Sequence, residues 1–295
     1  RMVVDGPHPP EARGWRRPGE ITPADVRWMA WHETATHALI GREVRDLGDG
    51  WLLYDATDRE PFWNRLEGVA WPREPAAFDR RLTEILALFA GLDRIPHLWA
   101  FPGFDEPPDL AERLLAFGFE DHGGGYMMAL DHDHAAIEPV RLPDVGGRTL
   151  TVERLHRLGG DAAEEAAKGI AEVLLSSFDV EPERRVAIEL EAVLGLATEP
   201  YHAILARVDG RPAAVARRTT FAGASYLSSI GTAPEFRGLG LGRLVTSLVV
   251  SDAIGAGSGW IYLGVFEDND VARRMYTSLG FVPVGGVSPD LLLRS

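Results

Sequence analysis

A glycine-rich run connects a strand-like segment to a strongly apolar segment of helical length; it reads Thr232-Ala-Pro-Glu-Phe-Arg-Gly-Leu-Gly-Leu-Gly-Arg243. Glycine adopts backbone dihedral angles that other residues avoid, and it lets a ligand approach the main chain closely. The first N–H groups of a helix have no acceptor inside the helix, and the helix dipole adds partial positive charge there. A strand that enters a helix through such a turn therefore predicts a binding site for a phosphate group.

Two common phosphate-binding motifs do not fit this run. A P-loop needs a lysine and then a serine or threonine after its last glycine, whereas Arg243 and Leu244 stand there. A dinucleotide-binding fingerprint needs a third glycine, and Val245 occupies that position. Acidic residues do follow the next predicted strand, at Glu267 and Asp268, but the incomplete fingerprint disfavours a dinucleotide site.

The hexad Arg237-Gly-Leu-Gly-Leu-Gly242 resembles the Arg/Gln-x-x-Gly-x-Gly/Ala signature of the GNAT superfamily of acyl-CoA-dependent N-acyltransferases. A second element similar to that family follows, Asn269-x-x-Ala-x-x-x-Tyr276 and then Leu-Gly-Phe281. The resemblance covers the chain from about residue 149 to its end. It implies an enzyme that transfers an acetyl group directly from acetyl-CoA, its co-substrate, to a small-molecule or peptide amine, without a metal.

The resemblance also implies roles for particular residues. The N–H groups of the glycine run hold the pyrophosphate of CoA, the arginine side chains neutralise it, and the end of the preceding strand pairs with the pantetheine arm. A main-chain N–H there polarises the thioester carbonyl. The implied cofactor-binding residues are Ile230, Gly231, Thr232, Arg237, Gly238, Leu239, Gly240, Leu241, Gly242, Arg243 and Asn269. Tyr276 is the implied catalytic acid, which protonates the departing thiolate.

Asn269 and Tyr276 also have a purely structural interpretation. They are seven residues apart, about two helical turns, so a helix over Val271 to Ser278 places them on one face. Asn269 stands where a helix cap is expected, and Tyr276 is a residue type that packs well in a core. The residues alone leave both interpretations open.

The first half of the chain repeats the order of the second. Residues 98–119 echo residues 261–281, with Asp109-Leu-Ala-Glu-Arg113 answering Asp270-Val-Ala-Arg-Arg274. We therefore predict an α/β (α+β) protein of two GNAT-like domains, over residues 1–135 and 136–295, each a mixed, mostly antiparallel sheet flanked by helices. The first copy has no glycine run before its helix at Pro75, and Leu115 stands at the tyrosine position. We expect it to be degenerate and to shape the acceptor pocket or a dimer surface.

Composition limits the functional class. Cysteine is absent, which excludes a thiol intermediate and fits a reducing cytoplasm. No apolar run approaches the roughly 20 residues of a membrane helix. The net charge of −14 argues against a nucleic-acid partner, and it either attracts a cationic amine or only keeps the surface soluble. A metal at His132 and His134 is disfavoured. We expect a cytoplasmic protein with no membrane or nucleic-acid partner, which can form a homodimer.

The general base is not evident, because residues 217–234 contain no aspartate, glutamate or histidine. The alternatives are a water chain through nearby serines, a residue from elsewhere in the chain, or the terminal carboxylate. The candidates are Ser228, Ser229, Asp179, Glu181, His202, Glu267 and Ser295. A second interpretation of the chain is a non-catalytic acyl-CoA-binding or sensory module that acts through a partner protein. A third, which only the duplication supports, is an acceptor similar to that of mycothiol synthase, another two-repeat enzyme of the superfamily.

Overall fold

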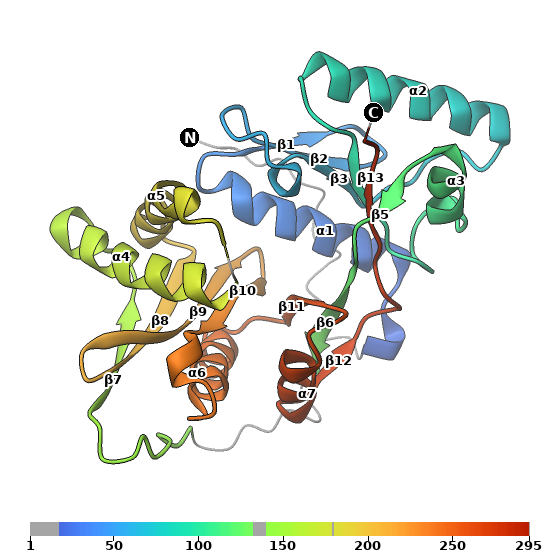
Figure 1. Cartoon of the computed structure of the whole chain (residues 1–295). Coiled ribbons are helices and arrows are strands. Elements are labelled where there is room, and N and C mark those ends of the chain that lie inside the picture. The colour runs from blue at the N-terminus through green and yellow to red at the C-terminus, as the bar shows by residue number, and fades with distance from the viewer. Residues whose placement is uncertain (1–17, 132–139, 179, 295) are drawn as a thin grey trace. The chain divides into compact units, whose positions relative to one another are not determined.

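The structure is a computed structural model that describes residues 18–131, 140–178 and 180–294 (Figure 1). Contacts divide the chain into two compact units. Unit 1 comprises residues 1–131, 264–274 and 281–295, and unit 2 comprises residues 132–263 and 275–280. In the part of the chain that is described, no helix is long and apolar enough to cross a membrane.

Unit 1 is built on a six-stranded sheet in the order β1-β2-β3-β4-β13-β5, in which only β3 and β4 run parallel. Its elements are α1 (Pro23–Ala38), β1 (Glu43–Asp46), β2 (Trp51–Tyr54), β3 (Arg65–Glu67), α2 (Pro75–Gly91), β4 (His97–Trp99), α3 (Leu110–Phe117), β5 (Glu120–Asp121), β6 (Gly125–Leu130), β12 (Phe281–Pro283) and β13 (Asp290–Leu292). Strands β6 and β12 form an additional antiparallel pair.

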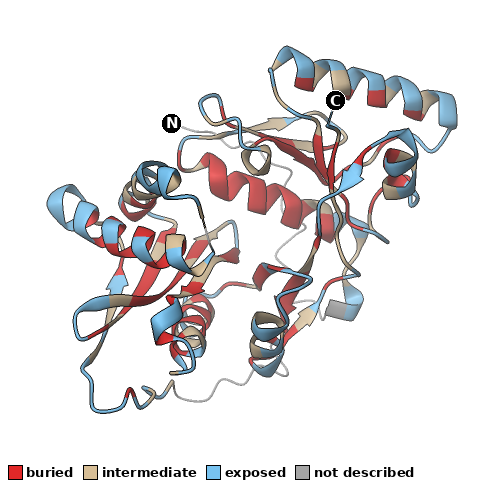
Figure 2. Ribbon diagram, in the orientation of Figure 1, coloured by how far each residue is buried: buried red, intermediate tan, exposed pale blue. Residues whose placement is uncertain are grey.

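The two long helices of unit 1 differ in how well the sequence predicts them. Helix α2 buries Phe78, Leu82, Ile85 and Phe89, the helical spacing that predicts its apolar face. Helix α1 is instead buried on nearly all sides, as Figure 2 shows, and its buried residues include polar ones such as His32. Because such a helix has no polar face, its sequence carries no helical period and no helix was expected there.

Unit 2 holds the sheet order β7-β8-β9-β10-β11, in which β10 and β11 are parallel and the other neighbours antiparallel. Its elements are β7 (Leu150–Leu155), α4 (Gly160–Ser177), α5 (Arg185–Ala197), β8 (Tyr201–Val208), β9 (Arg211–Phe221), β10 (Ala224–Thr232) and α6 (Leu241–Gly255). Strand β11 (Trp260–Phe266) and helix α7 (Asp270–Ser278) belong partly to each unit. Helices α4 and α5 pack on one face of the sheet through the core around Ile170 and Leu205.

These two mostly antiparallel sheets with their helices confirm the predicted fold class. Asp209 and Gly210 form a tight turn between β8 and β9, with φ angles of 50° and 78°.

The predicted division into residues 1–135 and 136–295 differs from the observed units in one respect. The boundary itself lies outside the described residues. Segments 264–274 and 281–295, however, belong to unit 1. Strand β13 explains the second segment, because it pairs with β4 and β5 and buries Leu291 and Leu292. A strand of three residues gives no sequence signal about which sheet it will join.

Candidate functional site

The glycine run adopts the conformation that its sequence predicts. Strand β10 ends at Thr232, a short turn spans Pro234–Phe236, and α6 begins at Leu241. Gly238 and Gly240 have φ angles of 79° and 76°, a left-handed region that favours glycine. At Gly242 the reason is space, because a Cβ there would lie 3.1 Å from Oγ1 of Thr232.

The main chain of this loop presents a group of free donors. Within the described residues, none of the backbone N–H groups from Gly238 to Arg243 has a hydrogen-bond acceptor. They stand at the positive end of the 15-residue helix α6, and Gly238 and Gly240 are exposed to solvent. An anion that binds here would satisfy these donors, so the loop has the chemistry of a phosphate site.

Two arginines flank the loop. Arg237 donates to the carbonyl oxygens of Thr232 and Ser177, each over 3.3 Å, so it connects the end of β10 to the end of α4. Arg243 donates to Oγ of Ser278, on α7. Both arginines are exposed, and their positive charge lies beside the free N–H groups.

Strand β10 has an open edge where it approaches the loop. It pairs with β11 only from Ala224 to Leu227, and from Ser228 onward its described strand partner is β9 alone. The predicted pantetheine-binding residues Ile230, Gly231 and Thr232 lie in this open part. Gly231 is required there, because a Cβ would lie 2.9 Å from Oγ of Ser177 at the end of α4. An extended ligand can pair with such an edge as an additional strand does.

The C-terminal turn of α7 lies against the loop. Sδ of Met275 is 3.9 Å from the position of a Cβ on Gly242, and Ser278 accepts from Arg243. Tyr276 lies between these two residues in the chain and is only 5% exposed. Burial raises the pKa of the Tyr276 phenol, which keeps it protonated, as a general acid must be.

Asn269 is the N-cap residue of α7. Its Oδ1 accepts a hydrogen bond from the Ala272 N–H over 3.1 Å, so the structural interpretation of this residue is confirmed. Its side-chain amide is exposed, and Nδ2 has no partner among the described residues. A contact with the pantetheine arm stays a prediction.

The candidate bases are scattered. Glu181 and Glu267 are exposed, and Asp179 and Ser295 lie outside the described residues, as do His132 and His134. No group of three or more metal-binding side chains occurs in the described part of the chain.

His202 is held in an unusual environment. It stacks on His156 with ring centroids 3.8 Å apart. Burial, and after it the charge of Arg218, lower the pKa of His202 to about 4. The ring is therefore neutral at physiological pH, and the ring of His156 covers one of its faces.

A carboxylate that the sequence did not indicate does reach the sheet. Glu191 of α5 accepts from Nη2 of Arg217 on β9 over 3.0 Å, and Nη2 also donates to Oγ of Ser229 on β10 over 2.5 Å. No sequence window reveals this contact, because the two partners of the salt bridge are 26 residues apart on different elements.

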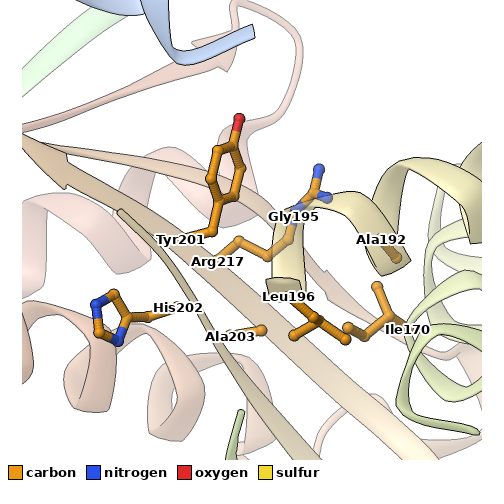
Figure 3. Close-up of a pocket in the computed structure, with 8 residues that line it drawn as sticks. All are labelled: Ile170, Ala192, Gly195, Leu196, Tyr201, His202, Ala203 and Arg217. Carbon is orange, nitrogen blue, oxygen red and sulfur yellow. The ribbon is translucent and has the colours of Figure 1, made fainter. Parts of the chain in front are cut away.

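A small pocket lies beside Arg217, between β8 and the helices α4 and α5 (Figure 3). It has room for about one water molecule, and apolar side chains line most of it. Its lining residues are Ile170, Ala192, Gly195, Leu196, Tyr201, His202, Ala203 and Arg217. Figure 3 shows that His202 and the Arg217 guanidinium point in different directions.

Comparisons with known proteins bear on the family and the fold of the chain. The sequence profile described as acetyltransferase (GNAT) family matches residues 167–281. Over 52 residues the chain is 44% identical to a mycothiol acetyltransferase of Nocardiopsis dassonvillei, a stretch that covers 18% of this chain and 16% of that protein.

Solved structures share the fold over most of the chain. A GCN5-related N-acetyltransferase from Kribbella flavida matches with a TM-score of 0.62 and 23% identity, over 92% of this chain and 96% of that one. A tandem GNAT protein from the clavulanic acid biosynthesis pathway matches with a TM-score of 0.60 and 18% identity, over 95% and 90%. Residues 167–281, which carry the glycine loop and Tyr276, are therefore a domain of the acetyltransferase (GNAT) family.

Proposed function

We propose that this chain transfers an acetyl group from acetyl-CoA to an amine, and that the working site lies in unit 2. The observation that carries the proposal is the row of N–H donors from Gly238 to Arg243, which have no acceptor among the described residues. They match the diphosphate of CoA in chemistry, and the two flanking arginines supply charge of the opposite sign.

The remaining parts of the donor molecule follow from this anchor. With the diphosphate on the loop, the pantetheine arm extends along the open edge of β10 and pairs with its main chain. The thioester carbonyl then lies at residues 230–232, where a backbone N–H stabilises negative charge on the oxygen.

The reaction is a direct transfer. The amine nitrogen attacks the thioester carbonyl carbon, the C–S bond breaks, and the proton that the amine loses passes to water. Tyr276 donates its phenolic proton to the CoA thiolate and regains a proton from solvent before the next turnover. Its raised pKa keeps the phenol protonated at neutral pH. Because the chain contains no cysteine, no acyl-cysteine intermediate forms.

A feature of unit 1 supports the proposal that only unit 2 has a working site. Its helix α2 stands where the repeat places the phosphate-binding helix. There the carboxylate of Glu74 accepts from the N–H groups of Ala76 and Ala77, over 3.0 and 2.7 Å. A side-chain anion of the chain itself thus satisfies N–H donors that a phosphate would otherwise need. We propose that unit 1 does not bind CoA and serves the acceptor or a dimer surface.

Calorimetry with CoA, acetyl-CoA and pantetheine tests the anchor. CoA and acetyl-CoA are expected to bind, and pantetheine, which lacks the diphosphate, is expected to bind far more weakly. Equal affinity for pantetheine and CoA, or no heat with acetyl-CoA, contradicts the proposal.

A panel of amines with CoA release as the readout then separates the enzyme from a non-catalytic acyl-CoA-binding module. The module binds acetyl-CoA and releases no CoA with any amine. The similarity to a mycothiol acetyltransferase makes the acceptor of that enzyme a useful member of the panel. An amine acceptor, a cytoplasmic location, a homodimer and the lack of a nucleic-acid partner stay predictions, with the net charge of −14 as support for the last.

A further inference from the structure

We propose that Arg217, braced by Glu191, is a positioning residue that anchors Ser229 and so holds the bulge of β10 in place. This bulge sets the direction of the main-chain N–H groups that meet the thioester carbonyl. The inference rests on the proposed function and adds two side chains to it, neither of which touches the substrate.

The bulge contains a strained residue. Between Ser228 and Gly231 strand β10 advances by three residues while β9 advances by two, from Arg217 to Val215, so β10 carries one extra residue. Within it, Ser229 has a φ angle of 52°, a conformation that non-glycine residues avoid.

Ser229 is unusual in its place as well as its conformation. The other non-glycine residues with positive φ in the described chain stand outside the strands; they are Asp93, Arg157, Asp209 and Ala222. A strained residue inside a strand persists only when its surroundings hold it there, and such residues cluster at functional sites.

Arg217 is the group that holds it. It pairs with Ser228 in the register of β9 and β10, and its Nη2 donates to Oγ of Ser229 and to Oε1 of Glu191. The side chains of Arg217 and Glu191 are 12% and 16% exposed, so solvent screens their ion pair only weakly. This places a charged anchor directly under the bulge.

The burial of Arg217 costs stability, and this indicates that the residue has a functional role. Nε of Arg217 is buried and has no hydrogen-bond partner among the described residues. A buried donor without a partner destabilises a fold, and native proteins keep few of them. A guanidinium stays protonated in proteins, so Arg217 cannot take the proton of the amine. Positioning is the role that its contacts support.

The bulge lies where it affects the reaction. It begins just after Leu227, where β10 stops pairing with β11. The N–H groups of residues 230–232 follow directly. If Ser229 relaxed to an ordinary strand conformation, these groups would rotate relative to the open edge, and the contact with the thioester oxygen would be lost.

The test uses acetyl-CoA labelled with ¹³C at the thioester carbonyl. In the wild-type protein we expect the bound carbonyl resonance to move downfield of free acetyl-CoA, because an N–H polarises it. In Arg217→Met the resonance is expected to return toward the free position. CoA release, with water or an active amine as acceptor, is expected to fall roughly 5- to 30-fold, the cost of a non-glycine left-handed residue without an anchor.

Two further variants keep this test decisive. CoA affinity is expected to stay within about threefold of wild type, because the phosphate loop is untouched. Arg218→Met, a buried arginine on the same strand, is the matched control and is expected to leave the resonance in place. If Arg217→Met does not fold, Ser229→Ala removes the anchored oxygen, retains the ion pair, and is expected to shift the resonance in the same way.

Rescue by glycine distinguishes positioning from substrate contact. Glycine adopts positive φ without an anchor, so Ser229→Gly in the Arg217→Met background is expected to restore the resonance and the rate to within about threefold of wild type. Ala222→Gly, which relaxes a turn elsewhere, is expected to restore neither.

Three results overturn the inference: an unshifted resonance in the wild type, an unchanged resonance in Arg217→Met, or a double variant that folds and stays inactive. Failure of the proposed function looks different, because the wild-type protein then either does not bind acetyl-CoA or binds it and releases no CoA with any amine.

Discussion

Replacing Gly240 by alanine tests whether the loop conformation itself binds CoA. Gly240 and Gly257 stand at opposite ends of α6 and share a φ angle of 76°. A Cβ on Gly240 would make only an ordinary contact, 3.4 Å from Cβ of Pro143, and a Cβ on Gly257 would meet nothing within 4 Å. Each substitution by alanine is therefore expected to cost the same conformational free energy, about 1–2 kcal/mol, without a steric clash.

The two sites differ in what holds them. The N–H of Gly257 donates to the Ile254 carbonyl over 2.9 Å, and the next N–H, of Ser258, donates to Ala253. This end of the helix cannot relax, so Gly257→Ala is expected to lower the free energy of unfolding by about 1–2 kcal/mol. The N–H of Gly240 has no acceptor among the described residues, so the loop can relax in the free protein. The cost then falls on binding, and the Kd for CoA is expected to rise roughly 5- to 30-fold.

Urea denaturation and calorimetry with CoA measure both quantities for both variants. The expected result is a crossed pattern: Gly257→Ala loses stability and keeps its CoA affinity, and Gly240→Ala loses CoA affinity with the smaller loss of stability. If Gly240→Ala binds CoA as tightly as the wild type, or if Gly257→Ala weakens binding equally, the loop is not the anchor that we propose.

Three further predictions concern the acid, the core and the buried charges. Tyr276→Phe is expected to lower the turnover number by about 10²- to 10⁴-fold with little change in CoA affinity, and steady-state kinetics with calorimetry checks this. Leu291→Ala, in the core of unit 1, is expected to lower the free energy of unfolding by about 2–5 kcal/mol, measured in urea, and to leave CoA affinity unchanged. Burial, and after it the charge of the neighbouring Glu33, raise the pKa of Glu67 in the folded protein. The free energy of unfolding of the wild type is therefore expected to fall by up to ~1.4 kcal/mol per pH unit as the pH rises from about 4.5 toward the pKa of Glu67 in the folded state. Glu67→Gln is expected to remove that part of the pH dependence, and an identical slope in both proteins contradicts it.

Much of the candidate site was predictable because its causes are local. Residues 238–242 alternate glycine and leucine, and both the turn and its free N–H groups follow from the conformational freedom of glycine at the start of a helix. The apolar stripe of α2 and the Asp209-Gly210 turn were predictable for the same reason, since neighbours in the chain decide them.

Other features were not predictable because they depend on distant partners. Helix α1 is buried on nearly all sides and so has no period to detect. The ion pair of Arg65 with Glu33 joins residues 32 positions apart, and that of Arg217 with Glu191 joins residues 26 apart. Strand β13 is short, and only its neighbours β4 and β5 define its place.

The sequence by itself determined the glycine turn at the start of α6 and the position of Tyr276 within its helix, because each depends on backbone freedom or on spacing along the chain. Tertiary structure alone decided that Tyr276 is buried with a raised pKa, that Ser229 is strained, and that Arg217 and Glu191 meet beneath it. Burial and charge pairing are properties of what surrounds a residue, and the surroundings exist only once the strands and helices have packed.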